Sequence, residues 1–130
     1  MVVDTSALIA ILFREPEGET FEDLVLRDSA TWISVVSRLE AAMVVEGRKG
    51  GSSGALHSAI QDLSLEILPF DRTQLTQAIY AFRRFGKGRR PAALNLGDCC
   101  SYGLAKALNE PLLFKGDDFT QTDISAVLTR

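Results

Sequence analysis

The chain has 130 residues, of which 46% are hydrophobic and 24% are charged, and its formal net charge is −3. This length and composition predict a single globular domain, residues 1–130, with a core that needs no disulfide framework. The mild negative charge excludes binding of nucleic acid through overall charge, and no apolar run reaches the roughly 18 residues that span a bilayer. An acid at position 4 interrupts the first apolar run, so a signal peptide is not predicted. We therefore expect a cytoplasmic protein without membrane contact.

Short apolar segments alternate with amphipathic segments along the chain. The segments with strand character are residues 1–4, 30–34, 66–70, 111–114 and 124–128. The segments with helical character are 6–13, one that begins at 16, 35–48, 55–63, 71–85 and 97–108. Such alternation is typical of βαβ units, in which the strands are parallel and helices cover both faces of the sheet. The sequence predicts an α/β fold with functional side chains at the carboxyl ends of the strands.

The helix predicted at 35–48 carries an acid beside its apolar stripe. The stripe consists of Val35, Leu39, Ala42 and Met43. Glu40 falls on or beside it, and a buried charge is costly unless it is paired or bound to a metal. The alternative is a capping box that runs from Ser37 to Glu40. The preceding strand ends near Ser34, so the helix begins before Ser37, which favours the functional interpretation.

Further acids follow the ends of predicted strands. Asp4 ends the first strand, Asp98 opens a helix, and Asp117 and Asp118 follow the strand at 111–114. Each has an ordinary structural interpretation as a helix cap, a dipole partner or a turn residue. Together with Glu40 they are expected at one edge of the sheet, where mutual repulsion would raise their pKa values unless a cation intervenes. Oxygen ligands suit Mg²⁺ or Mn²⁺, which hold phosphates and activate water.

Other sites are poorly supported by the sequence. His57 is the only histidine, which excludes a histidine acid–base pair and a zinc site of histidine and cysteine. Cys99 and Cys100 are neighbours that do not face one another on a helix, so we expect them to be reduced. A basic window holds Arg83, Arg84, Lys87, Arg89 and Arg90. It is either a patch for RNA phosphates or a solvated helix end.

Four segments carry a resemblance to a known family. They are MVVDTSAL at the start, SRLEAA around Glu40, LNLGDC around Asp98 and PLLFKGDDFTQTDI near the end. In these segments, which run in order from residue 1 to about 124, the chain resembles PIN-domain ribonucleases, specifically the VapC-type toxins of bacterial toxin–antitoxin pairs. The resemblance implies a parallel five-stranded sheet between helices and RNA cleavage that depends on Mg²⁺ or Mn²⁺.

The resemblance also implies roles for individual residues. Asp4 and Asp98 match acids that bind the metal directly, and Glu40 matches a further acid of the catalytic cluster. Asp118 is favoured as the fourth acid, and Asp117 is the alternative. The residues that match supporting polar positions are Thr5 or Ser6, Asn95 and Asp123.

The implied partners are RNA, a VapB-type antitoxin and a second copy of the chain. The expected assembly is a homodimer within a toxin–antitoxin hetero-oligomer, which would bind operator DNA only through the antitoxin. An antitoxin tail would pack along residues 7–13 and about 21–26 and place an Arg or Lys on the acids. Two rival interpretations are a receiver-like phosphoacceptor domain, for which Lys115 is suggestive but the paired early acid is missing, and a non-catalytic domain of similar fold.

Overall fold

A computed structural model of the chain describes residues 1–88 and 92–128. The strands in these residues are β1 (Val2–Val3), β2 (Trp32–Ser34), β3 (Glu66–Leu68) and β4 (Leu112–Leu113). The helices are α1 (Thr5–Leu12), α2 (Gly18–Arg27), α3 (Val35–Gly47), α4 (Ser53–Asp62), α5 (Arg72–Phe85) and α6 (Leu96–Leu108). The predicted helices are confirmed, and the strands are shorter than predicted.

The strands form one parallel sheet in the order β3-β2-β1-β4. β1 lies inside this sheet, because Val2 pairs with β2 on one side and with Leu112 of β4 on the other. The implied number of five strands is wrong for the described residues, which contain four. The segment predicted as the last strand contributes a single parallel bridge, from Ala126 to Leu112. Two backbone hydrogen bonds of 2.8 and 3.0 Å support this bridge, too few for a strand.

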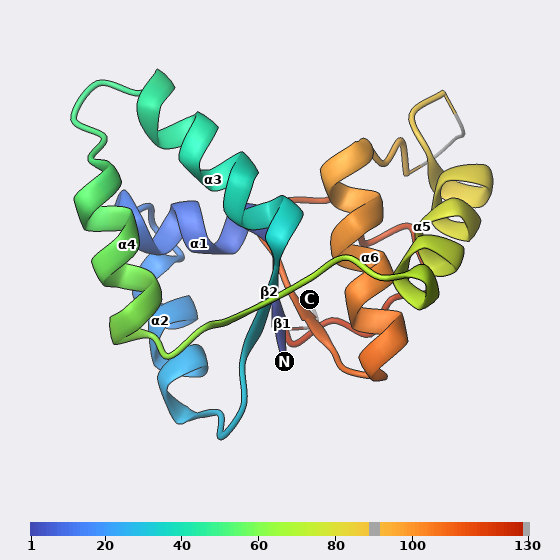
Figure 1. The fold of residues 1–130 in the computed structure, drawn as a ribbon, viewed down its shortest axis with the longest axis horizontal. Helices are drawn as coiled ribbons and strands as arrows, with labels where there is room; N and C mark the ends of the chain where they lie inside the picture. The colour runs from blue at the N-terminus through green and yellow to red at the C-terminus, as the bar shows by residue number, and fades with distance from the viewer. Residues whose placement is uncertain (89–91, 129–130) are drawn as a thin grey trace.

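Helices cover both faces of the sheet, which confirms the predicted α/β class. Figure 1 shows α1 to α4 on one side of the central strands and α5 and α6 on the other. Successive strand residues point to opposite faces. Val3 and Leu113 therefore join the buried cluster formed with α1 to α4, while Val2 and Leu112 join the cluster formed with α5 and α6. Each face of the short sheet thus has its own core.

Three helices begin at the carboxyl edge of the sheet. Asp4 caps α1 by accepting a hydrogen bond from the Ser6 amide at 3.1 Å. Ser34 caps α3 by accepting from the Val36 amide at 3.1 Å. The first turn of α6, capped by Asn95, lies at the same end of the molecule, away from the N-terminus (Figure 1). The sequence has thus placed three capped helix starts around one edge.

The buried face of α3 is not the predicted one. Val35, Leu39 and Met43 of the predicted apolar stripe are 43%, 60% and 65% exposed. The buried residues of α3 are Ser37, Ala41 and Val45. These smaller side chains allow α3 to pack against both α1 and α6. Glu40 lies beside the face formed by Ser37, Ala41 and Val45. Its partial burial therefore comes from this face and not from the predicted apolar stripe.

Two further expectations concern the membrane and the thiols. Within residues 1–88 and 92–128, no helix combines the length and the apolar character that crossing a bilayer requires. Cys99 and Cys100 are buried and free. Burial, together with the nearby charge of Asp98, raises the pKa of the Cys99 thiol to about 11, so the thiol stays protonated at neutral pH.

Candidate active site

Asp4 stands at the carboxyl end of β1 with only 3% of its surface exposed. Both carboxylate oxygens accept a hydrogen bond from a serine. The Ser6 hydroxyl donates to Oδ2 at 2.6 Å, and the Ser101 hydroxyl donates to Oδ1 at 2.5 Å. Ser6 also accepts a hydrogen bond from the Lys115 amide at 3.0 Å, which ties this position to the segment after β4. The carboxylate of Asp4 is therefore held in one orientation by α1 and α6 together.

A further serine extends this network into α3. The hydroxyl oxygens of Ser37 and Ser101 lie 3.1 Å apart, and both residues are fully buried. Ser101 has one hydroxyl proton, which it donates to Asp4, so Ser37 must be the donor to Ser101. The sequence analysis missed both serines. The available signal was spacing, since each stands three residues from an acid, Glu40 or Asp98, and hence on the same helical face.

Glu40 is half-buried on α3 and is held by a threonine. The Thr5 hydroxyl donates to Glu40 Oε1 at 2.8 Å. Burial raises the pKa of Glu40, and the charge of Asp4 adds to this, whereas the Thr5 hydrogen bond opposes it. Because α3 begins at Val35, Ser37 is inside the helix and cannot be its cap. The capping-box interpretation of Glu40 is therefore excluded.

Asp98 is half-buried in the first turn of α6. It forms a capping box with Asn95: the Asp98 amide donates to Asn95 Oδ1 at 2.9 Å, and the Asn95 amide donates to Asp98 Oδ2 at 3.1 Å. The pKa of Asp98 is raised to about 7, mainly by burial, although the Asn95 amide lowers it. The charges of Asp4, Asp118 and Glu40 raise it further. The structure therefore brings four predicted acids within electrostatic reach of one another.

The turn after β4 offers two neighbouring acids with different surroundings. The charge of Asp118 contributes to the raised pKa of Asp98. The backbone carbonyl of Asp117 accepts hydrogen bonds from the Thr120 amide at 3.1 Å and from the Thr120 hydroxyl at 2.7 Å. Asp118 thus interacts electrostatically with another acid of the cluster, and its role as the fourth acid stays a prediction with Asp117 as the alternative.

Asp123 lies apart from the other predicted supporting residues. Its carboxylate accepts a hydrogen bond from the Tyr102 hydroxyl at 2.7 Å and forms an ion pair of 3.5 Å with Lys106. In the part of the chain that the structure describes, none of its hydrogen bonds or ion pairs involves the four acids. Asp123 fastens the C-terminal segment to α6.

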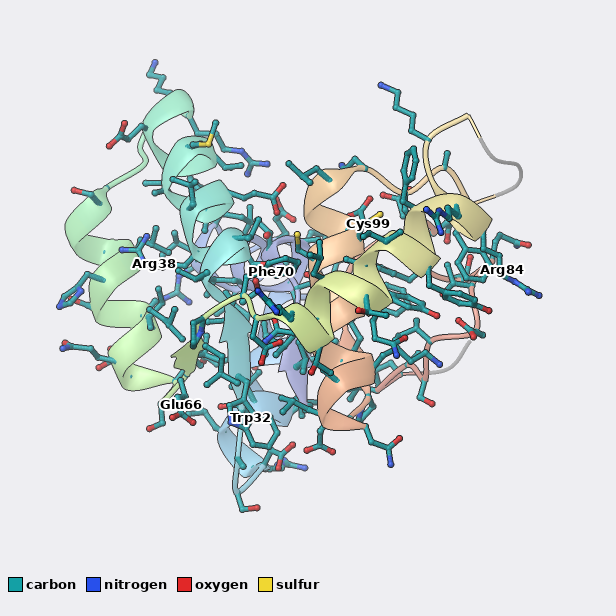
Figure 2. All side chains as sticks on the ribbon, turned by 45° about the vertical axis from the view of Figure 1, so that its right-hand side comes forward. Trp32, Arg38, Glu66, Phe70, Arg84 and Cys99 are labelled. Carbon is teal, nitrogen blue, oxygen red and sulfur yellow. The ribbon has the colours of Figure 1, made fainter. Side chains whose placement is uncertain are left out.

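The basic window divides into separate parts. Arg83 and Arg84 end α5 and line one surface hollow. Figure 2 shows Arg84 at the outer edge of the molecule, well away from Cys99. Lys87 borders another hollow, which reaches Asn95 and Cys99 at the start of α6. The other two arginines, Arg89 and Arg90, lie outside the described residues. Lys87 thus shares a hollow with the start of α6.

The donors at this edge are carboxylate oxygens, which suit Mg²⁺ or Mn²⁺. In the described ranges, no three acidic, histidine or cysteine side chains are arranged to enclose a metal ion as they stand. A cation bound directly by Asp4 and Asp98 needs no third protein ligand, because Mg²⁺ keeps several waters in proteins. Asp4 and Asp98 could therefore hold a cation together with water.

Sequence comparison places the chain among known proteins. A family model described as "PIN domain" matches residues 1–125. A curated relative, Ribonuclease VapC of Mycolicibacterium smegmatis, is 47% identical over 128 residues, which make up 98% of this chain and 99% of the relative. A match of this extent removes the receiver-like alternative.

Solved structures share the fold. VapC20 of Mycobacterium tuberculosis, described as a sarcin-ricin loop cleaving toxin, matches with a TM-score of 0.73 and 19% identity over 98% of both chains. VapBC2 from Rickettsia felis, bound to a DNA fragment from their promoter, matches with a TM-score of 0.68 and 17% identity over 96% of this chain and 94% of that chain. The chain belongs to the PIN-domain family, and its sequence relatives are VapC ribonucleases.

Proposed function

We propose that this protein is a metal-dependent endoribonuclease, the toxin of a toxin–antitoxin pair. The observation that carries the proposal is the gathering of four acids at one edge of the sheet. Burial raises the pKa of Asp98 to about 7, and the charges of Asp4, Asp118 and Glu40 raise it further. Four close carboxylates repel one another, so a chain that gathers them is suited to bind a cation. The name of the Mycolicibacterium smegmatis relative supports ribonuclease activity.

The four acids would bind the cation in two different ways. Asp4 and Asp98 would hold it directly, and Glu40 and Asp118 through water. When bound, Mg²⁺ or Mn²⁺ would activate water and stabilise charge on the phosphoryl oxygens. The chain itself contributes fixed orientations, because serine, threonine and asparagine partners hold three of these carboxylates in place.

Basic residues would hold the RNA backbone beside the acids. Lys87 adjoins the start of α6 and would contact a phosphate close to the cut. Arg83 and Arg84, further along the surface, would contact the strand at a greater distance from the acids. Contacts to phosphates position a strand without reading its bases. Base specificity would then depend on other residues.

RNA cleavage in the presence and absence of metal tests the proposal. An in vitro transcribed RNA should be cut in Mg²⁺ or Mn²⁺, poorly in Ca²⁺ and not in EDTA. Asp98→Asn should abolish cleavage. Asp71→Asn is the matched control, because Asp71 caps α5 outside the acid cluster. Undiminished cleavage in EDTA, or by Asp98→Asn, would refute the proposed chemistry.

A VapB-type antitoxin is the partner that we propose. Residues 7–11 of the expected docking segment 7–13 are buried in the core, so a partner could contact only the end of that segment. What remains is the end of α1 with α2 and α4, where Leu12, Leu26 and Leu63 border a hollow of about 330 Å³. Leu26 is 57% exposed there. The apolar part of an antitoxin tail would cover this hollow, and its Arg or Lys would reach the acids.

Co-expression with the neighbouring small gene tests the partnership. We expect the two proteins to co-purify, the complex to be inactive, and an antitoxin without its tail to inhibit poorly. Light scattering should give a homodimer for the toxin and a higher assembly for the complex. Operator DNA should shift in a gel only when the antitoxin is present. Full inhibition by the truncated antitoxin would refute the role of the tail.

A further inference from the structure

Gly97 occupies a position where glycine is unexpected. It is the second residue of α6, directly before Asp98, and it is buried. Glycine is a poor helix former, so its use inside the first turn needs a reason. The backbone gives none, because Gly97 is not among the described residues with positive φ. Capping gives none either, because Asn95 already caps the helix.

The side chain of Glu40 supplies the reason. A Cβ atom built on Gly97 would lie far inside van der Waals contact with both carboxylate oxygens and with Cδ of Glu40. The other glycines with comparably close neighbours, which meet backbone atoms first, are Gly18, Gly51, Gly86 and Gly103. At Gly97 the neighbour is instead the charged end of a side chain from another helix. The carboxylate occupies the space that a methyl group would take.

This contact helps to decide where the carboxylate of Glu40 lies. On one side, the Thr5 hydroxyl donates to Oε1 at 2.8 Å. On the other, the carboxylate lies over Gly97 at the amino end of α6, where the helix dipole favours negative charge. The next residue is Asp98, which senses the charge of Glu40. Glu40 can therefore approach the other acids only because residue 97 has no side chain.

We propose that Gly97 is a positioning residue that admits the carboxylate of Glu40 to the acid cluster. The inference rests on the proposed function, in which Glu40 acts on the bound cation through water. In Gly97→Ala, the methyl group would displace the carboxylate by roughly 1 Å, and a displacement of that size in an active site costs up to about 100-fold in rate. The fold would persist, since a flexible side chain moves aside and alanine favours the helix.

The experiment compares Gly97→Ala with Gly54→Ala. Gly54 is the second residue of α4, the same helical position, where a Cβ would meet only Ser52 Oγ at 3.7 Å. The measurements are the melting temperature of the metal-free protein, Mn²⁺ binding by calorimetry, and cleavage of an in vitro transcribed RNA. We expect Gly97→Ala to melt no lower than wild type, to bind Mn²⁺ more weakly and to cleave about 10- to 100-fold more slowly. Gly54→Ala should match wild type in binding and cleavage.

Introducing Gly97→Ala into Glu40→Ala tests whether Gly97 affects Mn²⁺ binding and cleavage through the Glu40 carboxylate. Without the carboxylate, Gly97→Ala should change Mn²⁺ binding, and whatever cleavage Glu40→Ala retains, by less than about twofold. An equal loss in both backgrounds would overturn the inference, and so would a fall of many degrees in the melting temperature of Gly97→Ala. Inactive Glu40→Ala with fully active Gly97→Ala would overturn it and leave the proposed function intact. Fully active Glu40→Ala would refute the role of Glu40 in the proposed function and this inference with it.

Discussion

Replacing Asp98 by asparagine should stabilise the metal-free protein at pH 8. The pKa of Asp98 is about 7 in the folded protein, against an ordinary value of 3.8, mainly because burial disfavours its charge. Since the folded pKa is the higher one, the free energy of unfolding falls as the pH rises from about 4 to about 7. The difference between the two pKa values corresponds to about 4 kcal/mol. Because Asp98 is half-buried, solvent screening reduces this to about 2 kcal/mol.

Asparagine has the size of aspartate and can still accept the hydrogen bond from the Asn95 amide. We therefore expect Asp98→Asn to melt roughly 6–10 °C above wild type at pH 8 in EDTA, and the gap to close near pH 4. Thermal unfolding followed by circular dichroism between pH 4 and 8.5 measures both quantities. Asp71→Asn reports the effect of replacing a capping carboxylate outside the cluster. If Asp98→Asn melts below wild type at pH 8, or if the gap does not change with pH, Asp98 acts as a helix cap alone.

Three further predictions concern the supporting residues. Ser101→Ala removes a donor to Asp4, so Mn²⁺ affinity measured by calorimetry should fall about tenfold or more; unchanged affinity would show that this hydroxyl is dispensable. Thr5→Val keeps its shape but releases Glu40, so RNA cleavage should slow about tenfold while the melting temperature shifts by only a few degrees; a rate equal to wild type would contradict this. Replacing both Arg83 and Arg84 by alanine should reduce the slope of log affinity for single-stranded RNA against log salt by about 1.4, and an unchanged slope would place them off the RNA path.

The acids could be predicted because each has a local signature. Asp4 and Asp98 stand where a strand or loop passes into a helix, and the caps formed there leave carboxylates at the edge of a parallel sheet. The resemblance to VapC toxins then selected the residues. The sequence does not predict the roles of Gly97, Ser37 and Ser101, because these roles depend on the packing of α3 against α6. No spacing within one helix reveals which side chain of the other helix lies opposite.

The fold was predictable in outline and less so in its faces. Strands that alternate with helices lead to a parallel sheet whatever the details of packing. Hydrophobic periodicity chose the wrong face of α3, because the helix buries smaller residues where it meets α6 and leaves Leu39 and Met43 exposed. The last predicted strand, 124–128, has apolar residues but only one bridge to Leu112. Its neighbours Thr122 and Asp123 are engaged in turn and side-chain hydrogen bonds instead.

The pairing of β1 with β4 determines when the acid cluster can assemble as the chain folds. Val2 is matched with Leu112, so the centre of the sheet closes only after residues near 112 have left the ribosome. Before then, one edge of β1 has no strand to pair with, and Asp118 cannot join the other acids. The four acids can therefore come together only after β4 and the turn that follows it have folded against β1.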